Sequence, residues 1–393
     1  MSEQRGAGGN RPVYSNHNLQ IIFAVTLMAV MGAAVITPAL PQVERALDLS
    51  PGRVALLLTV FTLPGIALTP VLGVLADRLG RKRVLVPSLL LFGVAGGACA
   101  LARQMDVLLV LRFLQGCGAA ALATTSLTMI GDIFSGGDRD AAMGYNSSVL
   151  SVGTASYPAL GGALATFGWY YPFALPLVAI PVGLVVLLFL DLPESRGEED
   201  LRRYFAHVRD SLRDRRTGGL LCATMVMFVI LYGPMITYLP ILLDDSFGAS
   251  AFVAGLLLSS ASLTTAVTSS QLGKITRRVS RAALVKTAFV LYAAVLIIIP
   301  LMPDLPSLLV PAVIFGLAQG INFPNIFSML TGSVEAENRG ALIALNGMGF
   351  RLGQTLGPLV MGFAAATLGI AGAYYATAGL AAAMFFVALA TIR

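Results

Sequence analysis

Residues 73–83 read GVLADRLGRKR and separate two long apolar runs, at about 53–76 and 84–102. A bilayer core is about 30 Å thick, and a helix of about 20 apolar residues crosses it. Two such runs joined by so few residues predict a tight helical hairpin. The joining stretch carries one acid and four bases, and short basic loops stay on the cytoplasmic side. It therefore predicts how its neighbours are oriented in the membrane.

The composition excludes an ordinary soluble domain. Of the 393 residues, 56% are hydrophobic and 12% are charged, whereas soluble domains carry about 25% charged residues. The net charge of +6 comes from bases in the loops between apolar runs, which indicates membrane orientation rather than a nucleic-acid partner. The cysteines, Cys99, Cys117 and Cys222, lie in apolar runs without the spacing of metal ligands.

Twelve apolar runs are long enough to cross a bilayer. The first is too long for the apolar region of a signal peptide and predicts an uncleaved span. Bases gather in the loops that an N-inside topology with an even number of spans places in the cytoplasm. We therefore expect a multi-pass protein of the inner (plasma) membrane with both termini cytoplasmic. The predicted spans are 19–41, 51–76, 84–103, 106–132, 141–166, 170–190, 218–242, 251–273, 282–302, 306–332, 340–366 and 370–391.

The longest break between spans is residues 191–217, which is rich in charge and has apolar residues at helical spacing. This pattern predicts an amphipathic helix on the cytoplasmic face. It divides the chain into an N-terminal six-helix bundle, 1–190, and a C-terminal six-helix bundle, 218–393. A shift of 200 residues superposes several glycines, arginines and prolines, Pro158 on Pro358 among them. We predict an all-α membrane protein with 12 transmembrane helices in two pseudo-symmetric bundles.

Residues 73–83 resemble the loop 2–3 signature of the major facilitator superfamily at every defining position. Residues 108–120 resemble its span 4 motif. Residues 153–162 resemble the span 5 signature of its drug/proton antiporters, with Tyr157 where that signature usually has Gly. A basic membrane-anchor turn is the alternative for 73–83, but it needs neither an Asp nor paired glycines. The resemblance covers nearly the whole chain and implies the major facilitator fold, in the twelve-span, drug/proton antiporter-like subgroup.

The resemblance implies a gate at residues 73–83. Asp77 would dock on the N-terminal end of span 11, near 338–340, where free N–H groups favour a negative charge. Arg81 would pair with Asp132 at the inner end of span 4. Glycines would let neighbouring segments approach closely, and a solvated charged turn is the alternative. The predicted gating residues are Gly73, Asp77, Arg78, Gly80, Arg81 and Asp132.

Two arginines lie inside apolar runs. An unpaired guanidinium in the membrane costs about 2.5 kcal/mol or more, so each must face protein or water. Arg112 is expected to serve the transport pathway or proton coupling, and snorkelling to the outer surface is the alternative. Arg351 lies about ten residues into span 11. It is expected to line a central cavity, and a structural hydrogen-bond hub is the alternative.

No Asp or Glu lies near the middle of a predicted span. Many drug/proton antiporters of the superfamily that the chain resembles carry such a carboxylate. A central site with Arg112 and Arg351 and no carboxylate would be electropositive. The predicted substrate is therefore neutral, amphipathic or anionic rather than a lipophilic dication. Other polar residues within spans are candidates for the cavity, although each could form a helix–helix hydrogen bond instead. The predicted coupling or substrate-binding residues are Arg112, Gln115, Tyr145, Asn146, Tyr157, Tyr232, Tyr238, Gln319, Asn322, Asn346, Arg351 and Gln354.

The sequence has no catalytic constellation and no phosphate-binding loop with Lys, so we expect no enzyme, cofactor or metal. The resemblance to the major facilitator superfamily implies a secondary active transporter working by alternating access. The resemblance to its drug/proton antiporter-like subgroup implies an efflux antiporter of small amphipathic compounds driven by the proton gradient. A uniporter or symporter of a small organic anion or metabolite is the alternative with the same fold. A membrane-embedded enzyme or receptor would leave the repeat unexplained. We expect a monomer in the lipid bilayer, with a small-molecule substrate and protons as the coupling ion.

Overall fold

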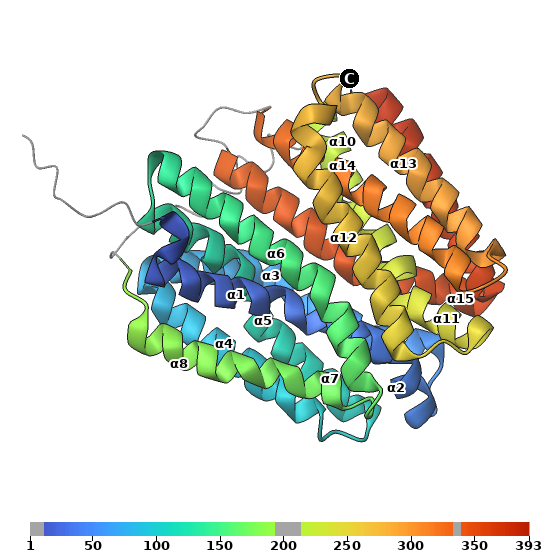
Figure 1. Ribbon diagram of the computed structural model, residues 1–393, viewed down its shortest axis with the longest axis horizontal. Helices are drawn as coiled ribbons and strands as arrows, with labels where there is room; N and C mark the ends of the chain where they lie inside the picture. The colour runs from blue at the N-terminus through green and yellow to red at the C-terminus, as the bar shows by residue number, and fades with distance from the viewer. Residues whose placement is uncertain (1–11, 193–213, 333–338, 393) are drawn as a thin grey trace, which may run out of the picture.

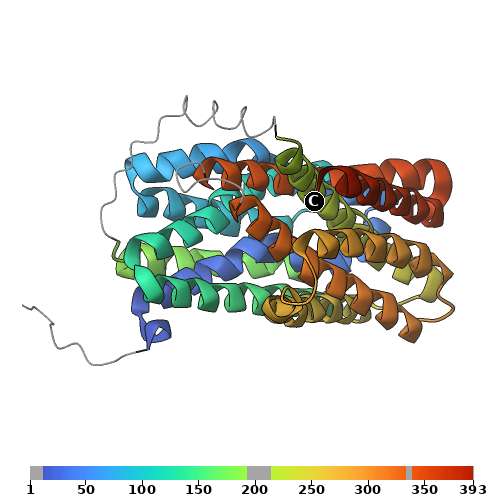
Figure 2. The ribbon, with the colours of Figure 1, turned by 90° about the horizontal axis from the view of Figure 1, so that it is seen from above.

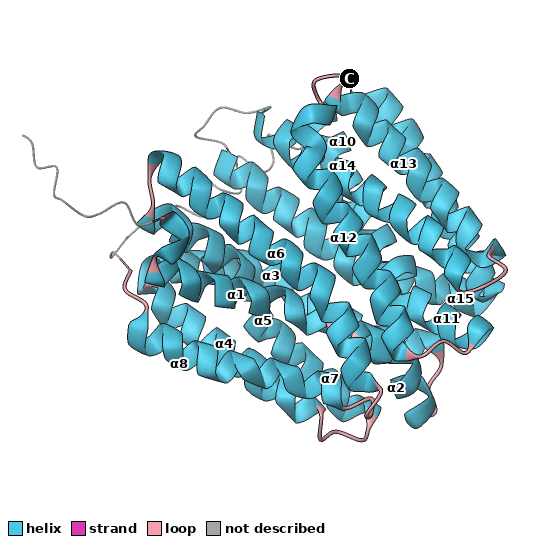
Figure 3. Cartoon of the chain, in the orientation of Figure 1, coloured by secondary structure: helices cyan, strands magenta, loops and turns pink. Residues whose placement is uncertain are grey.

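The computed structural model describes residues 12–192, 214–332 and 339–392, which form helices joined by short turns (Figure 3). Ten helical stretches in these ranges are long and apolar enough to span a membrane. One of them bends at Gly369, where φ is 74°, and so holds two helices. Helix α6 adds another crossing of 30 residues. The described chain therefore makes the twelve crossings that the sequence predicts.

The first bundle is built around α5, which contacts α1, α3 and α4. A short 3₁₀ turn carries the first crossing from α1 into α2, and another carries the sixth from α7 into α8. The elements of this bundle are α1 (His17–Ala34), η2 (Thr37–Ala39), α2 (Leu40–Ala46), α3 (Pro51–Leu79), α4 (Arg81–Cys99), α5 (Met105–Ile133), α6 (Gly136–Ala165), α7 (Tyr171–Ala174), η3 (Leu175–Val178) and α8 (Ala179–Phe189).

The second bundle begins at Asp214, whose carboxylate caps α10 by accepting bonds from the Thr217 amide and hydroxyl. These bonds favour the ionised form and hold the pKa of Asp214 below its usual value. Most of the amphipathic helix predicted at 191–217 lies outside the described residues. The elements of this bundle are α10 (Arg215–Ile230), η4 (Leu231–Tyr238), α11 (Leu239–Phe247), α12 (Ala251–Ile275), α13 (Arg281–Ile298), α14 (Leu309–Gly332) and α15 (Arg339–Thr391).

The stretch 73–83 is helical on both sides of one residue. Helix α3 continues to Leu79 and α4 begins at Arg81. Gly80 alone makes the turn, with a φ of 97° that residues with a Cβ avoid. The third crossing therefore begins before the predicted residue 84. The expected close approach at Gly73 and Gly80 is wrong for the described chain, because a Cβ at either would have no neighbouring described atom within 4 Å.

The two bundles meet where α6 packs on α12 and α3 packs on α15, a double contact that we call the seam (Figures 1 and 2). A Cβ at Gly162 would collide with the carbonyl oxygen of Ala251, and a Cβ at Gly255 with that of Pro158. Only glycine lets the two backbones come this close, which is how small residues pack membrane helices. Of the glycines in the span 5 signature, Gly162 therefore serves the seam, whereas Gly161 packs on the Val35 backbone within the first bundle.

The seam occupies one end of the molecule. In α6, 3 of the 15 residues 151–165 are exposed, against 10 of the 15 residues 136–150. At the seam end, Arg45 at the end of α2 forms a 3.1 Å ion pair with Asp244 of α11. This ion pair joins the two bundles. The bundles are therefore joined at the seam end, and α6 becomes exposed toward the other end.

We expect a wedge at the seam to open it. Gly162→Val presses a branched side chain against backbone that cannot move aside, so it favours the state in which the seam end is open and the opposite end is closed. Tyr145 is 41% exposed at that opposite end. A cysteine at this position, in a cysteine-free background, should react more slowly with a bulky maleimide in the Gly162→Val variant.

Gly144→Val is the matched control for this wedge. It lies on the same helix, and a Cβ there would meet no neighbouring described atom within 4 Å, so labelling should keep its wild-type rate. Equal labelling rates in Gly162→Val and wild type would contradict the expectation.

Candidate functional site

Arg81 lies between two carboxylates from neighbouring helices. Its Nε is 2.7 Å from Asp132 Oδ2 near the end of α5, and its Nη2 is 3.4 Å from Asp77 Oδ1 near the end of α3. The ion pair with Asp132 is the one expected from the sequence, whereas Arg78 is exposed. The predicted dock for Asp77, near 338–340, falls outside the described side chains. The gating role of this cluster therefore stays a prediction.

Arg112 lies inside the first bundle and not between the bundles. It is fully buried, so the snorkelling alternative is wrong. Its Nε donates to the Leu57 carbonyl of α3 at 3.1 Å, and its Nη1 donates to the Gly32 carbonyl of α1 at 3.0 Å and to Gln115 Oε1. The guanidinium also lies 4.2 Å from the Phe61 ring centre. Arg112 thus ties α1, α3 and α5 together through their backbones.

Asn146 and Asn346, which the 200-residue shift pairs, make equivalent hydrogen bonds in the two bundles. Thr26 of α1 donates to Asn146 Oδ1 at 2.7 Å, and Thr224 of α10 donates to Asn346 Oδ1 at 2.8 Å. Both asparagines are buried. Each therefore makes a bond between two helices of its own bundle, which is the structural alternative that the sequence left open.

A second polar chain lies on α15 and the seventh crossing. Arg351 Nη1 donates to Gln354 Oε1 at 3.2 Å, and Gln354 Nε2 donates to the Tyr232 hydroxyl at 2.7 Å. Tyr232 lies in the π-helical segment η4, where Pro234 interrupts the regular helix and the Thr237 hydroxyl bonds to the Tyr232 carbonyl. Such wide turns occur often at functional sites.

Arg351 reaches across to the other bundle. A Cβ at Gly65 of α3 would lie 3.1 Å from both Cδ and Nε of Arg351. One helical turn further along α15, the hydroxyl groups of Thr355 and Thr62 are 2.9 Å apart. Arg351 is half-buried, while Thr355 and Thr62 are buried. Its guanidinium thus lies beside the contact between α3 and α15, and its lining of a central cavity stays a prediction.

The remaining predicted residues do not join this group. Tyr292 donates to Gln319 Oε1 at 2.6 Å inside the second bundle, where Asn322 is also fully buried. Tyr157 is buried. Its ring lies near Gly153, where the Leu27 and Val30 side chains of α1 also pack. Tyr238 is fully buried at the seam end.

The comparisons with known proteins agree with this architecture. The sequence model of the Major Facilitator Superfamily matches residues 22–245 and again residues 220–393. The chain belongs to the Major Facilitator Superfamily. It is therefore a multi-pass membrane transporter for small molecules and not an enzyme.

Relatives of this superfamily member include exporters. It is 34% identical over 163 residues to the bacillibactin exporter of Bacillus subtilis (strain 168), an alignment that spans 40% of each chain. It is 23% identical over 350 residues to multidrug resistance protein 2 of the same organism, which spans 87% of each. The chain thus aligns with less than half the length of the first relative.

Solved structures share the fold. A bacterial homolog of the human lysosomal transporter Spinster, in an inward-facing and unoccupied conformation, matches with a TM-score of 0.82 over 98% of both chains at 19% identity. The human organic anion transporter MFSD10 matches with a TM-score of 0.69 over 94% of this chain and 98% of its own, at 20% identity. At these identities the likeness shows the fold alone.

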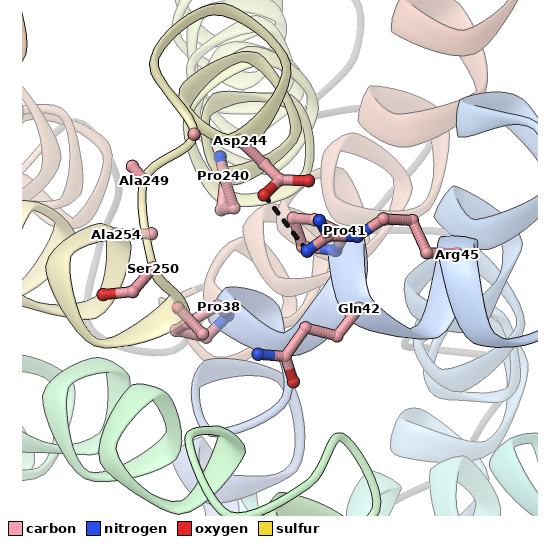
Figure 4. A pocket seen from close by; sticks show the side chains of 11 residues that line it. Pro38, Pro41, Gln42, Arg45, Pro240, Asp244, Ala249, Ser250 and Ala254 are labelled. Atoms are coloured by element: carbon pink, nitrogen blue, oxygen red, sulfur yellow. Dashed lines mark ion pairs between the residues drawn. The ribbon is translucent and has the colours of Figure 1, made fainter.

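Sequence reasoning missed the partners of Arg351 on the other bundle. Gly65 is one of 41 glycines and carries no signal of its own. Thr59 and Thr62, which contact Thr355 rather than Arg351, lie three residues apart in an apolar run and mark a polar face of α3. It also missed the ion pair of Arg45 with Asp244. The cavity beside that pair, between the ends of α2 and α11, measures about 140 Å³ (Figure 4). Ligand pockets measure about 300–1,000 Å³, so this cavity is a packing gap at the closed end.

We expect Arg112→Lys to destabilise this transporter. A lysine ammonium cannot reproduce the planar fork that bonds to carbonyls on two different helices. Loss of one or two charge-assisted hydrogen bonds should lower the free energy of unfolding by about 2–4 kcal/mol, measured by denaturant unfolding in detergent. Arg53→Lys, at an exposed arginine, should change it by less than about 0.5 kcal/mol. Equal stability of Arg112→Lys and wild type would contradict the bracing role.

Proposed function

We propose that this chain is a secondary active exporter of small amphipathic compounds, which works by alternating access and is driven by the proton gradient. The named exporters among its relatives support the direction of transport. The carrying observation is the one-ended seam, because two bundles that touch at one end only are one of the two states that alternating access requires.

The distribution of charge supports an orientation. Basic residues are concentrated in residues 78–83 and 274–281, at the end opposite the seam, and basic loops face the cytoplasm. We therefore place both termini in the cytoplasm, the protein in the plasma membrane, and the seam at the outer face. In this assignment the described state opens inward. The proposed parts are the bundles 1–190 and 218–393 and the cytoplasmic linker 191–217.

The Arg81 cluster would act in the opposite state. When the seam opens, the inner ends of α3 and α15 approach each other, and Asp77 comes toward the start of α15. A helix N-terminus favours an anion by about 0.3–1 kcal/mol, and up to about 2 kcal/mol when partly buried. Arg81 would hold Asp77 at 3.4 Å while Asp132 holds Arg81 at 2.7 Å. The cluster would then act as the inner latch.

The alternative is a uniporter or symporter of a small organic anion. One observation favours it: among the described residues, no carboxylate forms an ion pair with Arg112 or Arg351. An exporter without a carboxylate near the middle of its spans would bind its proton elsewhere, as at the carboxylates near the helix ends.

Everted membrane vesicles separate the two functions. Respiration acidifies their interior, and an amphipathic substrate should then enter the vesicles as protons leave, which dequenches acridine orange. Vesicles without the transporter should show no dequenching, and neither should vesicles treated with a protonophore, because they hold no gradient. Substrate flux with an unchanged proton gradient would replace the antiporter with the uniporter, and absence of flux for cationic, neutral and anionic amphiphiles would contradict both.

A further inference from the structure

The guanidinium of Arg351 keeps an open hydrogen-bonding edge. In the described chain, its one hydrogen bond runs from Nη1 to Gln354, and neither Nε nor Nη2 has an acceptor. No described carboxylate forms an ion pair with it. Nε and Nη2 together form the planar fork that binds a carboxylate through two parallel bonds. The side chain is half-buried, so this fork is partly desolvated and still reachable.

Gln354 and Tyr232 add a second donor. Gln354 Oε1 accepts from Arg351, and Gln354 Nε2 donates to the Tyr232 oxygen. The Tyr232 oxygen is therefore already an acceptor, and its own O–H remains to donate. Bonds in such a chain polarise one another, which strengthens the terminal donor. Both free ends of the chain thus offer protons, and an anion or another acceptor is the ligand that fits them.

Aromatic rings lie beside these donors. The Phe350 ring centre lies 5.5 Å from the Arg351 guanidinium and 4.0 Å from the Phe228 ring centre. Phe228 also contacts Tyr232 at 6.3 Å and Phe323 at 5.8 Å. Phe323 is 39% exposed, so this cluster of aromatic rings has one open face. An apolar or aromatic body can therefore pack beside the donors.

The donors sit where both bundles can respond to a ligand. The Arg351 side chain packs against Gly65 of the first bundle, while Gln354 and Tyr232 belong to the second. A ligand that binds Nε and Nη2 of Arg351 therefore lies beside the contact between α3 of the first bundle and α15 of the second. Its binding energy can therefore differ between the two states of the transporter, which any coupled substrate requires.

We infer that Arg351, Gln354 and Tyr232 form a subsite for the carboxylate of an amphipathic organic monoanion, whose apolar body packs on Phe228, Phe323 and Phe350. The inference rests on the proposed transport function and names the class of its substrate. It assigns the recognition of charge to the second bundle alone, and it separates Arg351, which binds substrate, from Arg112, which braces the fold.

Three matched naphthalene probes test the subsite on the purified full-length protein by equilibrium dialysis: 1-naphthylacetate, its neutral amide, and 2-(1-naphthyl)ethylamine. Wild type should bind the carboxylate at least about tenfold more tightly than the amide, as one charge-assisted bond implies. Arg351→Gln should remove this preference and leave the affinity for the amide within about twofold. Arg351→Lys should keep part of it, because the charge remains and the fork is lost.

Two further variants keep the test decisive if Arg351→Gln does not fold. Tyr232→Phe removes one donor and keeps the ring, so it should weaken carboxylate binding about threefold to tenfold. Gln354→Glu places a carboxylate against Arg351, so it should abolish carboxylate binding and improve amine binding. Arg103→Gln is the matched control. It removes an equal charge from the turn between α4 and α5, where Arg103 lies over Trp169, and it should leave all affinities unchanged.

Several outcomes would overturn the subsite: wild type without a carboxylate preference, Arg351→Gln or Gln354→Glu with the wild-type preference, or Arg103→Gln with an equal loss. Flux in proteoliposomes tells the two proposals apart. If wild type binds 1-naphthylacetate at the subsite and moves none of the three probes, transport fails and the subsite stands. If wild type and Arg351→Gln move the probes alike, the subsite fails and transport stands.

Discussion

Backbone packed directly on backbone holds the two bundles of this protein together. Lipid tails are as apolar as leucine side chains, so helices in a bilayer gain little from hydrophobic burial against each other. They gain from close van der Waals contact, and the seam achieves it at Gly162 and Gly255, where a single methyl group would strike a carbonyl oxygen. Because this contact lies at one end of the bundles, it can hold one end shut without fixing the other.

A contact of this kind suits a transporter. It depends on shape rather than on strong bonds, and the ion pair beside it, Arg45 with Asp244, has an exposed arginine, so it adds little stability. The seam can therefore open at modest cost when a competing contact forms at the other end. The Arg81 cluster supplies charged groups for such a contact, and the single Gly80 turn keeps them at the ends of adjoining helices.

Arg112 and Arg351 both lie in apolar runs of the sequence, but the folded protein gives them different environments. Arg112 finds two backbone carbonyls and the Gln115 side chain, and is sealed in the first bundle. Arg351 finds one side-chain acceptor and keeps its Nε and Nη2 without a described partner beside the other bundle. A guanidinium in a membrane must be satisfied by protein, water or ligand. Arg112 makes three hydrogen bonds to the protein and keeps only a sealed Nη2 without one, whereas Arg351 has donors left beside the other bundle for a ligand.

The sequence alone determined the twelve crossings, because apolar runs in lipid have to become helices that satisfy their own backbone. Its 200-residue repeat determined the two-bundle architecture, and its motifs determined the family. It misplaced the start of α4 and of α6, where charged residues at 81–83 and 138–140 continue helices beyond the apolar core. It also singled out Arg351, Gln354 and Tyr232 one by one. Only the tertiary structure brought Tyr232 and Gln354 together across 122 residues, and only it enclosed Arg112. The partners of a side chain depend on which helices pack beside it, and the local sequence does not specify that packing.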